Sequence, residues 1–145
     1  MSKKKRFDFL EHTADVYIAA YGRTLEEAFE NAALATIEVM TDAEKVKPKI
    51  QRNVQVGAQD EYALLYNWIE KILILFDIES LLFSSFKLSR LEKIEGGFRL
   101  KAEIKGETFD PKRHLQKIGV KSITYHLMEI VRKPEEVTVK FVLDI

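Results

Sequence analysis

From about residue 80 onward, apolar residues recur at every second position, which is the pattern of strands with one buried face. Two such segments, 86–94 (FKLSRLEKI) and 98–106 (FRLKAEIKG), flank Gly96-Gly97 and predict a β-hairpin. Two further strands are predicted at 122–131 and 136–145, on either side of the turn RKPEE. This half of the chain therefore predicts antiparallel strands joined by turns.

The first half of the chain contains the helix signals. Thr24 and Glu27 form a Thr-x-x-Glu capping box, and apolar residues then recur at helical spacing to about residue 40. Asp60 is a predicted N-cap of a second helix, whose wide apolar face between Leu64 and Phe76 indicates burial on more than one side. Further strands are predicted at 6–11, 16–21 and 49–57.

These segments predict an α+β fold, in which a mostly antiparallel framework of about seven strands packs with two main α-helices. Helices do not alternate regularly with strands, which argues against a parallel sheet. No repeat or linker interrupts the chain, so we expect a single domain over residues 1–145.

Composition excludes several classes of protein. Lys plus Arg and Asp plus Glu number 23 each, so there is no global field for nucleic acid or an anionic membrane, and we expect no stable nucleic-acid binding. The absence of cysteine excludes disulfides, thiolate zinc sites and thiol nucleophiles. The start MSKKKR runs into FDFL without an apolar h-region, and the longest apolar run is too short to span a bilayer. We therefore expect a cytoplasmic protein without a membrane partner.

The turn EHTAD, between the first two predicted strands, holds several polar residues. The sequence has no phosphate loop, serine elbow or His-x-x-x-His pair. In the turn, Thr13 and Asp15 are expected to bond neighbouring backbone amides, and His12 to be an exposed turn histidine. His126 lies within an alternating strand, which favours a satisfied histidine between strands over a ligand.

The loop FDPKRH is less ordinary. Asp110 is a predicted N-cap and Pro111 the first residue of a short helical turn. Lys112, Arg113 and His114 then occupy the first turn, where the helix dipole disfavours positive charge. Such local inconsistencies concentrate at functional sites, so the loop is a candidate to hold a phosphate or a partner's carboxylate. An ordinary basic surface loop is the equally weighted alternative.

The end of the chain reads as strand to its last residue, although termini usually fray. Asp144 then places its carboxylate close to the α-carboxylate of Ile145, and two anions this close repel unless a cation joins them. With Asp15 alongside, three carboxylates would make an oxygen-rich site suited to Ca²⁺, Mg²⁺ or Mn²⁺.

Nearly the whole chain resembles the archease family. The segments that carry the resemblance occur in order: EHTADV, IAAYG and TLEEAFENAALA within 11–35, VMTD at 39–42, LLYNWIEKIL around Trp68, GETFDPKRH at 106–114, VKSITYHLMEI at 120–130 and the terminal FVLDI. The His12–Asp15 turn together with the Thr24 capping box is specific in combination. Leu127-Met128 after TYH and the compact RKPEE turn are mild departures, and neither touches the expected site.

The resemblance implies an accessory protein, not an enzyme, that activates the RtcB-type tRNA-splicing RNA ligase by promoting guanylylation of the ligase and its multiple turnover. It implies a divalent cation, Ca²⁺ first and Mg²⁺ or Mn²⁺ as alternatives. The implied metal ligands are Asp15, Asp144 and Ile145. The candidates for contacts with the partner or with phosphate are His12, Lys112, Arg113, His114 and His126.

Two other classes of function stay open. A general chaperone-like protein-binding module would need an extended exposed apolar surface, which the sequence does not display. A metal-dependent phosphotransfer enzyme would need an assembled base and a nucleotide pocket, and no nucleotide motif is present.

Overall fold

The structure is a computed structural model that describes residues 5–10 and 15–145. The elements in chain order are β1 (Phe7–Leu10), β2 (Val16–Gly22), α1 (Leu25–Met40), the 3₁₀ turn η1 (Ala43–Lys45), β3 (Ile50–Ala58), α2 (Glu61–Glu79), β4 (Leu81–Leu88), β5 (Glu92–Ile94), β6 (Gly97–Thr108), β7 (Ser122–Lys133) and β8 (Glu136–Asp144). The described residues therefore confirm the predicted α+β fold, with eight strands where about seven were expected.

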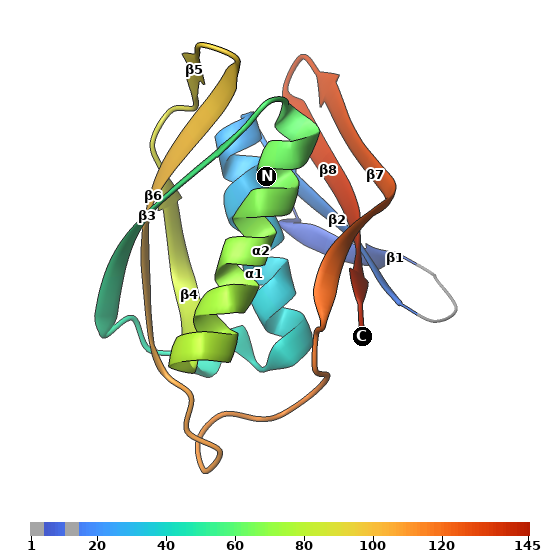
Figure 1. Cartoon of the computed structure of the whole chain (residues 1–145). Helices are drawn as coiled ribbons and strands as arrows, with labels where there is room; N and C mark the ends of the chain where they lie inside the picture. The colour runs from blue at the N-terminus through green and yellow to red at the C-terminus, as the bar shows by residue number, and fades with distance from the viewer. Residues whose placement is uncertain (1–4, 11–14) are drawn as a thin grey trace.

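The strands form two antiparallel sheets on opposite sides of the helices (Figure 1). One sheet has the order β1-β2-β8-β7, and the other has the order β3-β6-β4 with β5 also paired to β6. Helix α1 packs against β2 and β4, and α2 packs against β3 and β7. Because both sheets bury their inner faces on the same helices, one apolar core joins them. Among the described residues, no helix combines the length and apolar character needed to cross a bilayer.

Both helices begin as the sequence predicts. The hydroxyl of Thr24 accepts a hydrogen bond from the Glu27 N–H at 3.1 Å, and the Glu27 carboxylate accepts from the Arg23 N–H at 2.7 Å. The carboxylate of Asp60 caps α2 by accepting from the Ala63 N–H at 2.8 Å. These bonds satisfy N–H groups that have no partner inside the helix, which fixes where each helix starts.

The predicted hairpin forms, but its details differ from the expectation. The turn is Glu95-Gly96, with Gly96 at φ +80°, and Gly97 begins β6 instead of closing the turn. A Cβ on Gly97 would lie 2.1 Å from the Ala58 carbonyl oxygen, so the close approach of β3 requires glycine there.

The strand predicted over 86–94 is interrupted. Residues 89–91 separate β4 from β5, and carboxylates of α1 bond the backbone on both sides of this gap. Glu30 accepts from the Leu88 N–H and Glu26 from the Leu91 N–H, each at 2.8 Å. A helix side chain thus replaces a strand neighbour as the hydrogen-bond partner at each position.

Strand β7 confirms the prediction of a strand over this segment, but its pairing with β8 is irregular between Thr124 and Glu129. Leu127 adopts a left-handed backbone conformation, with φ 58°. Tyr125, His126 and Leu127 are exposed as a result of this bulge. His126 is thus exposed, with its backbone N–H donating to the Thr124 hydroxyl at 3.3 Å, and the expectation of a satisfied histidine between strands stays a prediction.

Candidate metal and partner site

The strand register brings Asp15 and Asp144 to the same end of one sheet. Strand β8 lies between β2 and β7, and Val16 pairs with Leu143 across the β2–β8 ladder. Asp15 directly precedes Val16 and Asp144 directly follows Leu143, so the two aspartates occupy neighbouring positions where the ladder ends. Both residues are partly buried.

Asp144 is held from the other side by β7. It pairs with Ser122, and its carbonyl oxygen accepts a hydrogen bond from the Lys121 N–H at 2.8 Å. This contact continues the ladder to the last residue of β8, so the backbone that carries the terminal carboxylates does not fray. Lys121 lies within the quoted segment VKSITYHLMEI, but no sequence argument assigned it to this end of the sheet.

Asp15 also borders a cavity of about 330 Å³ between β1, α1 and the loop before β7. Phe9, Val39 and Ile118 supply apolar walls, while Glu38 and Lys117 supply an ion pair with Nζ 2.5 Å from Oε2. The loop is fixed here by the Lys117 N–H, which donates to the Met40 carbonyl at 3.0 Å. The space beside Asp15 is therefore partly apolar and partly charged.

The donor set of this region fits a hard cation. Two aspartates at neighbouring positions, with the Ile145 carboxylate next in the chain, offer only oxygen atoms, which Ca²⁺ and Mg²⁺ prefer. Among the described residues, no group of three or more His, Cys, Asp or Glu side chains is close enough to hold a metal ion. The side chains alone thus supply two carboxylates, and binding of a metal stays a prediction. The expected contact residue His12 lies outside the described residues.

The loop FDPKRH forms the predicted single turn but uses its cationic residues internally. The Arg113 and His114 N–H groups both donate to the Asp110 carbonyl, at 3.0 and 2.8 Å. The His114 side chain is buried, and its Nε2 lies 2.9 Å from Oε2 of Glu107. Its Nδ1 accepts from the Asp110 N–H at 2.8 Å, so the proton is on Nε2. The expectation that His114 meets a partner does not fit this enclosed position.

Glu107 is the centre of this internal cluster. The Arg113 guanidinium donates to Oε1 of Glu107, and the Lys47 N–H donates to Oε2 at 2.7 Å. Burial disfavours the charged carboxylate, but the hydrogen bonds from Lys47, His114 and Arg113 outweigh burial and lower the pKa of Glu107 to about 2. Arg113 and Lys112 are both exposed. Arg113 is already bonded to Glu107, whereas Lys112 has no ion pair within the described residues.

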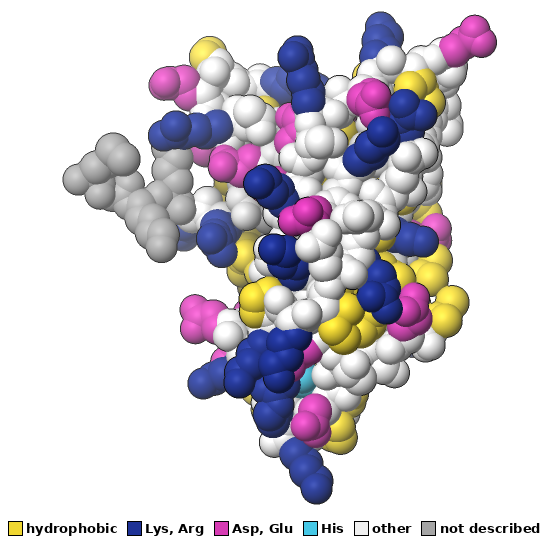
Figure 2. Space-filling model, turned by 90° about the vertical axis from the view of Figure 1, so that its left-hand side faces the viewer, with side chains coloured by type: hydrophobic (Ala, Val, Ile, Leu, Met, Phe, Trp, Pro, Cys, Tyr) yellow, Lys and Arg dark blue, Asp and Glu magenta, His cyan; other side chains and the backbone are white. Residues whose placement is uncertain are grey.

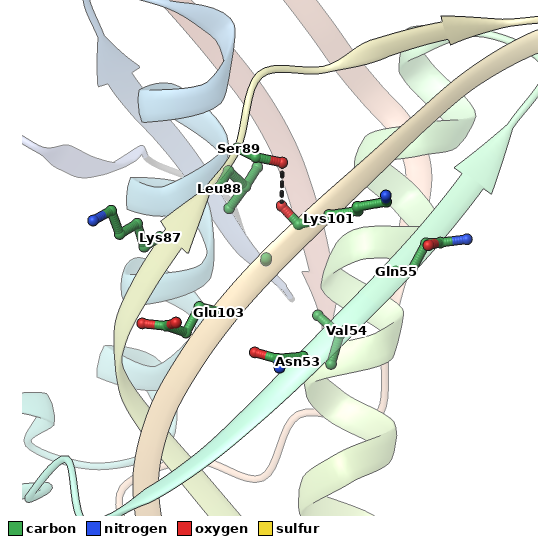
Figure 3. A pocket seen from close by; sticks show the side chains of 9 residues that line it. Asn53, Val54, Gln55, Lys87, Leu88, Ser89, Lys101 and Glu103 are labelled. Carbon is green, nitrogen blue, oxygen red and sulfur yellow. Dashed lines mark hydrogen bonds between the residues drawn. The ribbon is translucent and has the colours of Figure 1, made fainter.

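A second hollow lies on the β3-β6-β4 sheet, away from Asp15 and Asp144. It is a groove of about 570 Å³ across β3, β6 and β4, with Asn53, Gln55, Lys87 and Glu103 around it (Figure 3). The Ser89 hydroxyl donates to the Lys101 carbonyl at 3.2 Å at its edge. Lys and Arg side chains are spread over this face of the molecule with acidic ones between them (Figure 2). The groove is open, with Val54, Leu88 and Ala102 between its polar side chains, and has no convergent set of reactive groups among the described residues.

These features define the class of the protein: an α+β protein of two antiparallel sheets around two helices, with a pair of aspartates at the end of the β2–β8 ladder. A sequence model of the archease protein family matches residues 7–145. The chain therefore belongs to the archease family.

Individual relatives agree with this assignment. The chain is 48% identical over 141 residues to a protein archease of Sulfurisphaera tokodaii, covering 97% of this chain and 99% of the relative. It is 46% identical over 131 residues to one of Thermococcus kodakarensis, with 90% and 92% covered. The solution structure of Methanobacterium thermoautotrophicum protein 1598 matches with a TM-score of 0.84 at 38% identity, covering 97% and 99% of the two chains.

A more distant structure shares the fold alone. The crystal structure of a Thermotoga maritima protein, described as an archease and possible chaperone, matches with a TM-score of 0.56 at 18% identity. It covers 100% of this chain and 98% of the Thermotoga chain.

Proposed function

We propose that this chain is an accessory protein that activates an RtcB-type tRNA-splicing RNA ligase and is not itself an enzyme. It promotes guanylylation of the ligase and supports its multiple turnover. Membership of the archease family supports the proposal, together with the motif resemblance over the whole chain. The observation that carries it is the register that sets Asp15 beside Asp144 at the end of β8.

On this proposal, Asp15, Asp144 and the carboxylate of Ile145 hold a divalent cation, Ca²⁺ or in its place Mg²⁺ or Mn²⁺. When bound, the cation supplies positive charge that can attract a phosphate group. The chain's own contribution is to hold the carboxylates in place: β2 positions Asp15, and the bonds from β7 fix the backbone of Asp144. Lys112, Arg113 and His126, all exposed, stay candidate contacts with the ligase.

A guanylylation assay tests the proposal directly. The purified ligase is incubated with labelled GTP, with and without substoichiometric amounts of this protein, and the labelled ligase is quantified. We expect faster labelling and more ligation turnovers with the wild-type protein, and loss of both effects with Asp15→Asn or Asp144→Asn. Glu103→Gln, on β6 of the other sheet, is the control and should stimulate fully. Equal stimulation by the aspartate variants would separate the activity from these residues.

Two expectations follow from this role. The protein would act in the cytoplasm beside the ligase, and it would contact the ligase without holding RNA stably itself. Its net charge of zero supports the second expectation.

A chaperone-like protein-binding function is the second candidate, and a structural observation favours it. Large apolar side chains are exposed on α2 and β7, which the sequence pattern did not indicate. A general chaperone should suppress aggregation of several unrelated unfolded proteins at stoichiometric amounts. If light scattering shows no such effect, this candidate fails while ligase activation stands.

A further inference from the structure

Helix α2 has an apolar row on its solvent side. Tyr62, Tyr66, Glu70, Ile74 and Ile78 follow one another at intervals of four residues, so they form one ridge that crosses the exposed side of the helix obliquely. The row is about 24 Å long at 1.5 Å per residue. Tyr62 is 42% exposed, Ile74 40% and Ile78 78%. The opposite side of α2 is buried, with Trp68 donating to the Phe29 carbonyl at 2.9 Å.

The fold leaves this row uncovered. In Figure 1, α2 lies in front of α1, between the two sheets, and no other element lies in front of it. Figure 2 shows hydrophobic side chains gathered low on the right, toward the lower end of α2. The prediction that α2 is buried on more than one side is thus met by α1 and the flanking strands, but not along this row.

The bulge of β7 extends the row sideways. Tyr125 stacks on Tyr66 with ring centroids 4.5 Å apart and planes 8° apart, and Tyr125 is 54% exposed. The Tyr62 hydroxyl accepts a hydrogen bond from the Ile130 N–H at 3.3 Å. Leu127, which holds its left-handed conformation at the tip of the bulge, is 44% exposed. The fold retains this unfavourable conformation while presenting an apolar side chain to solvent.

We call these residues the α2–β7 surface: Tyr62, Tyr66, Glu70, Ile74, Ile78, Tyr125 and Leu127.

The α2–β7 surface is acidic as well as apolar. Asp60, Glu70 and Asp77 lie on α2 or at its N-cap, and within the described chain Glu70 and Asp77 form no ion pair. Burial raises the pKa of Tyr125, and the charges of Tyr66, Asp60 and Glu70 raise it further. Cations are attracted both by carboxylates and by the faces of tyrosine rings.

We propose that the α2–β7 surface docks a basic amphipathic helix of a partner protein. The apolar face of that helix packs along the row, and its flanking Lys or Arg side chains meet Glu70, Asp77 and the Tyr66–Tyr125 pair. A second copy of this chain is the less suitable occupant, because a twofold contact would place this acidic surface against an identical acidic surface. The inference does not depend on the aspartates at the end of β8.

A designed peptide tests the proposal. The probe is a fluorescein-labelled, 18-residue helical peptide of Leu and Lys, with Leu confined to one face. Two controls have the same Leu pattern with Glu in place of Lys, and the same Leu and Lys composition in a scrambled order. We expect saturable binding of the Leu/Lys helix by fluorescence anisotropy and binding at least about tenfold weaker for both controls.

Matched variants locate the binding. Glu70→Lys and Ile78→Lys replace exposed residues of the surface, and each should weaken binding of the Leu/Lys helix by about tenfold. Glu103→Lys on β6 and Ile94→Lys on β5 make the same changes at a partly exposed and an exposed position elsewhere and should bind as wild type. Circular dichroism and thermal unfolding check that all four variants fold.

Three results would overturn the proposal: no saturable binding, equal weakening by the matched controls, or equal affinity for the Glu peptide. Sedimentation tests the second-copy alternative. A dimer abolished by Ile78→Lys would assign the surface to self-association instead. None of these results bears on stimulation of the ligase by the Asp15 and Asp144 region, so the two proposals fail separately.

Discussion

At the scale of single residues, Glu107 makes the stability of the folded chain depend on pH. Its pKa is lowered to about 2 from an ordinary value of 4.5, so below pH 4.5 the unfolded chain binds a proton that the folded chain resists. The stabilisation from this carboxylate is complete above pH 4.5 and is lost as the pH falls through 4.5 toward 2. Urea unfolding at pH 7, 4 and 3 should therefore show a steep loss of stability on the acid side.

Glu107→Gln should lower the free energy of unfolding at pH 7 by about 3 kcal/mol, because it breaks a buried network with Arg113 and His114. It should also flatten the acid part of the profile. Glu103→Gln, on the same strand, removes a partly exposed carboxylate 3.8 Å from Lys105 and should change stability by no more than about 0.5 kcal/mol. An unchanged acid slope in Glu107→Gln would assign the pH dependence to other groups.

Asp15 gives a second prediction at this scale. Replacing Asp15 with Asn keeps its size but removes one of the proposed anionic ligands, so calorimetric Ca²⁺ affinity should fall by about tenfold or more. Asp77→Asn, an exposed aspartate on α2, should leave the affinity unchanged. Ca²⁺ bound equally by both variants would show that Asp15 is not a ligand.

The sequence predicts the meeting of Asp15 with Asp144 better than it predicts the enclosed cluster around Glu107. Asp15 and Asp144 each adjoin a strand end, so their meeting needs only that the second and last strands pair, and they do. The enclosed position of His114 depends on Glu107 turning inward and on the Lys47 N–H from a distant segment. A pattern of three cationic residues in a turn does not contain that information, so the loop looked more available to a partner than it is.

At the scale of elements, carboxylates of α1 stabilise the gap between β4 and β5 by accepting hydrogen bonds from its backbone. Burial raises the pKa of Glu30, against the effect of the hydrogen bond from the Leu88 N–H. The charged form of Glu30 is thus costly in the folded chain, and its contribution to stability decreases as the pH rises through its pKa. Glu30→Gln keeps an acceptor for Leu88 and removes the charge, so stability at pH 7 should be equal or higher.

Glu30→Ala should instead cost about 1–2 kcal/mol and speed amide hydrogen exchange at Leu88, because that N–H loses its acceptor. Glu44→Ala, on an exposed residue of η1, is the matched control and should alter neither quantity. Unchanged exchange at Leu88 in Glu30→Ala would show that the side chain does not hold this end of β4.

The limits of sequence reasoning at this scale have the same origin. The starts of α1 and α2 were predictable because their caps lie within three residues of the groups they bond. The β4–β5 gap was not, because the bonding carboxylates lie 58 and 65 residues earlier in the chain. The bulge at Leu127 is similarly hidden, since the alternating pattern there is typical of a regular strand.

At the scale of the whole molecule, the α+β class follows from local periodicity, but the division into two sheets does not. The pairing of β2 with β8 joins segments near the two ends of the chain. Strand β6 pairs with β3, which precedes α2 in the sequence, and with β4, which follows it. Such pairings are set by which apolar faces meet on the helices, and local patterns do not specify them. The two-sided enclosure of the helices is also what leaves one row of α2 facing solvent between the sheets.

The central place of β8 gives the last prediction. Ile145 follows the final strand residue, and its carboxylate is a proposed ligand beside Asp144. Extending the chain after Ile145 by Gly-Ser-Gly converts that carboxylate into a neutral amide and moves the terminal charge away. Ca²⁺ affinity should fall by about tenfold, and stimulation of the ligase should fall with it. The midpoint of thermal unfolding should stay within about 2 °C, because the paired part of β8 is unchanged.

The same three residues added before Met1 are the matched control and should affect neither Ca²⁺ binding nor stimulation. If the C-terminal extension binds Ca²⁺ as tightly as wild type, the Ile145 carboxylate is not a ligand, and the two aspartates must hold the cation with other oxygen atoms. If affinity is kept but stimulation is lost, the end of β8 meets the ligase through its shape, and the metal has a separate role.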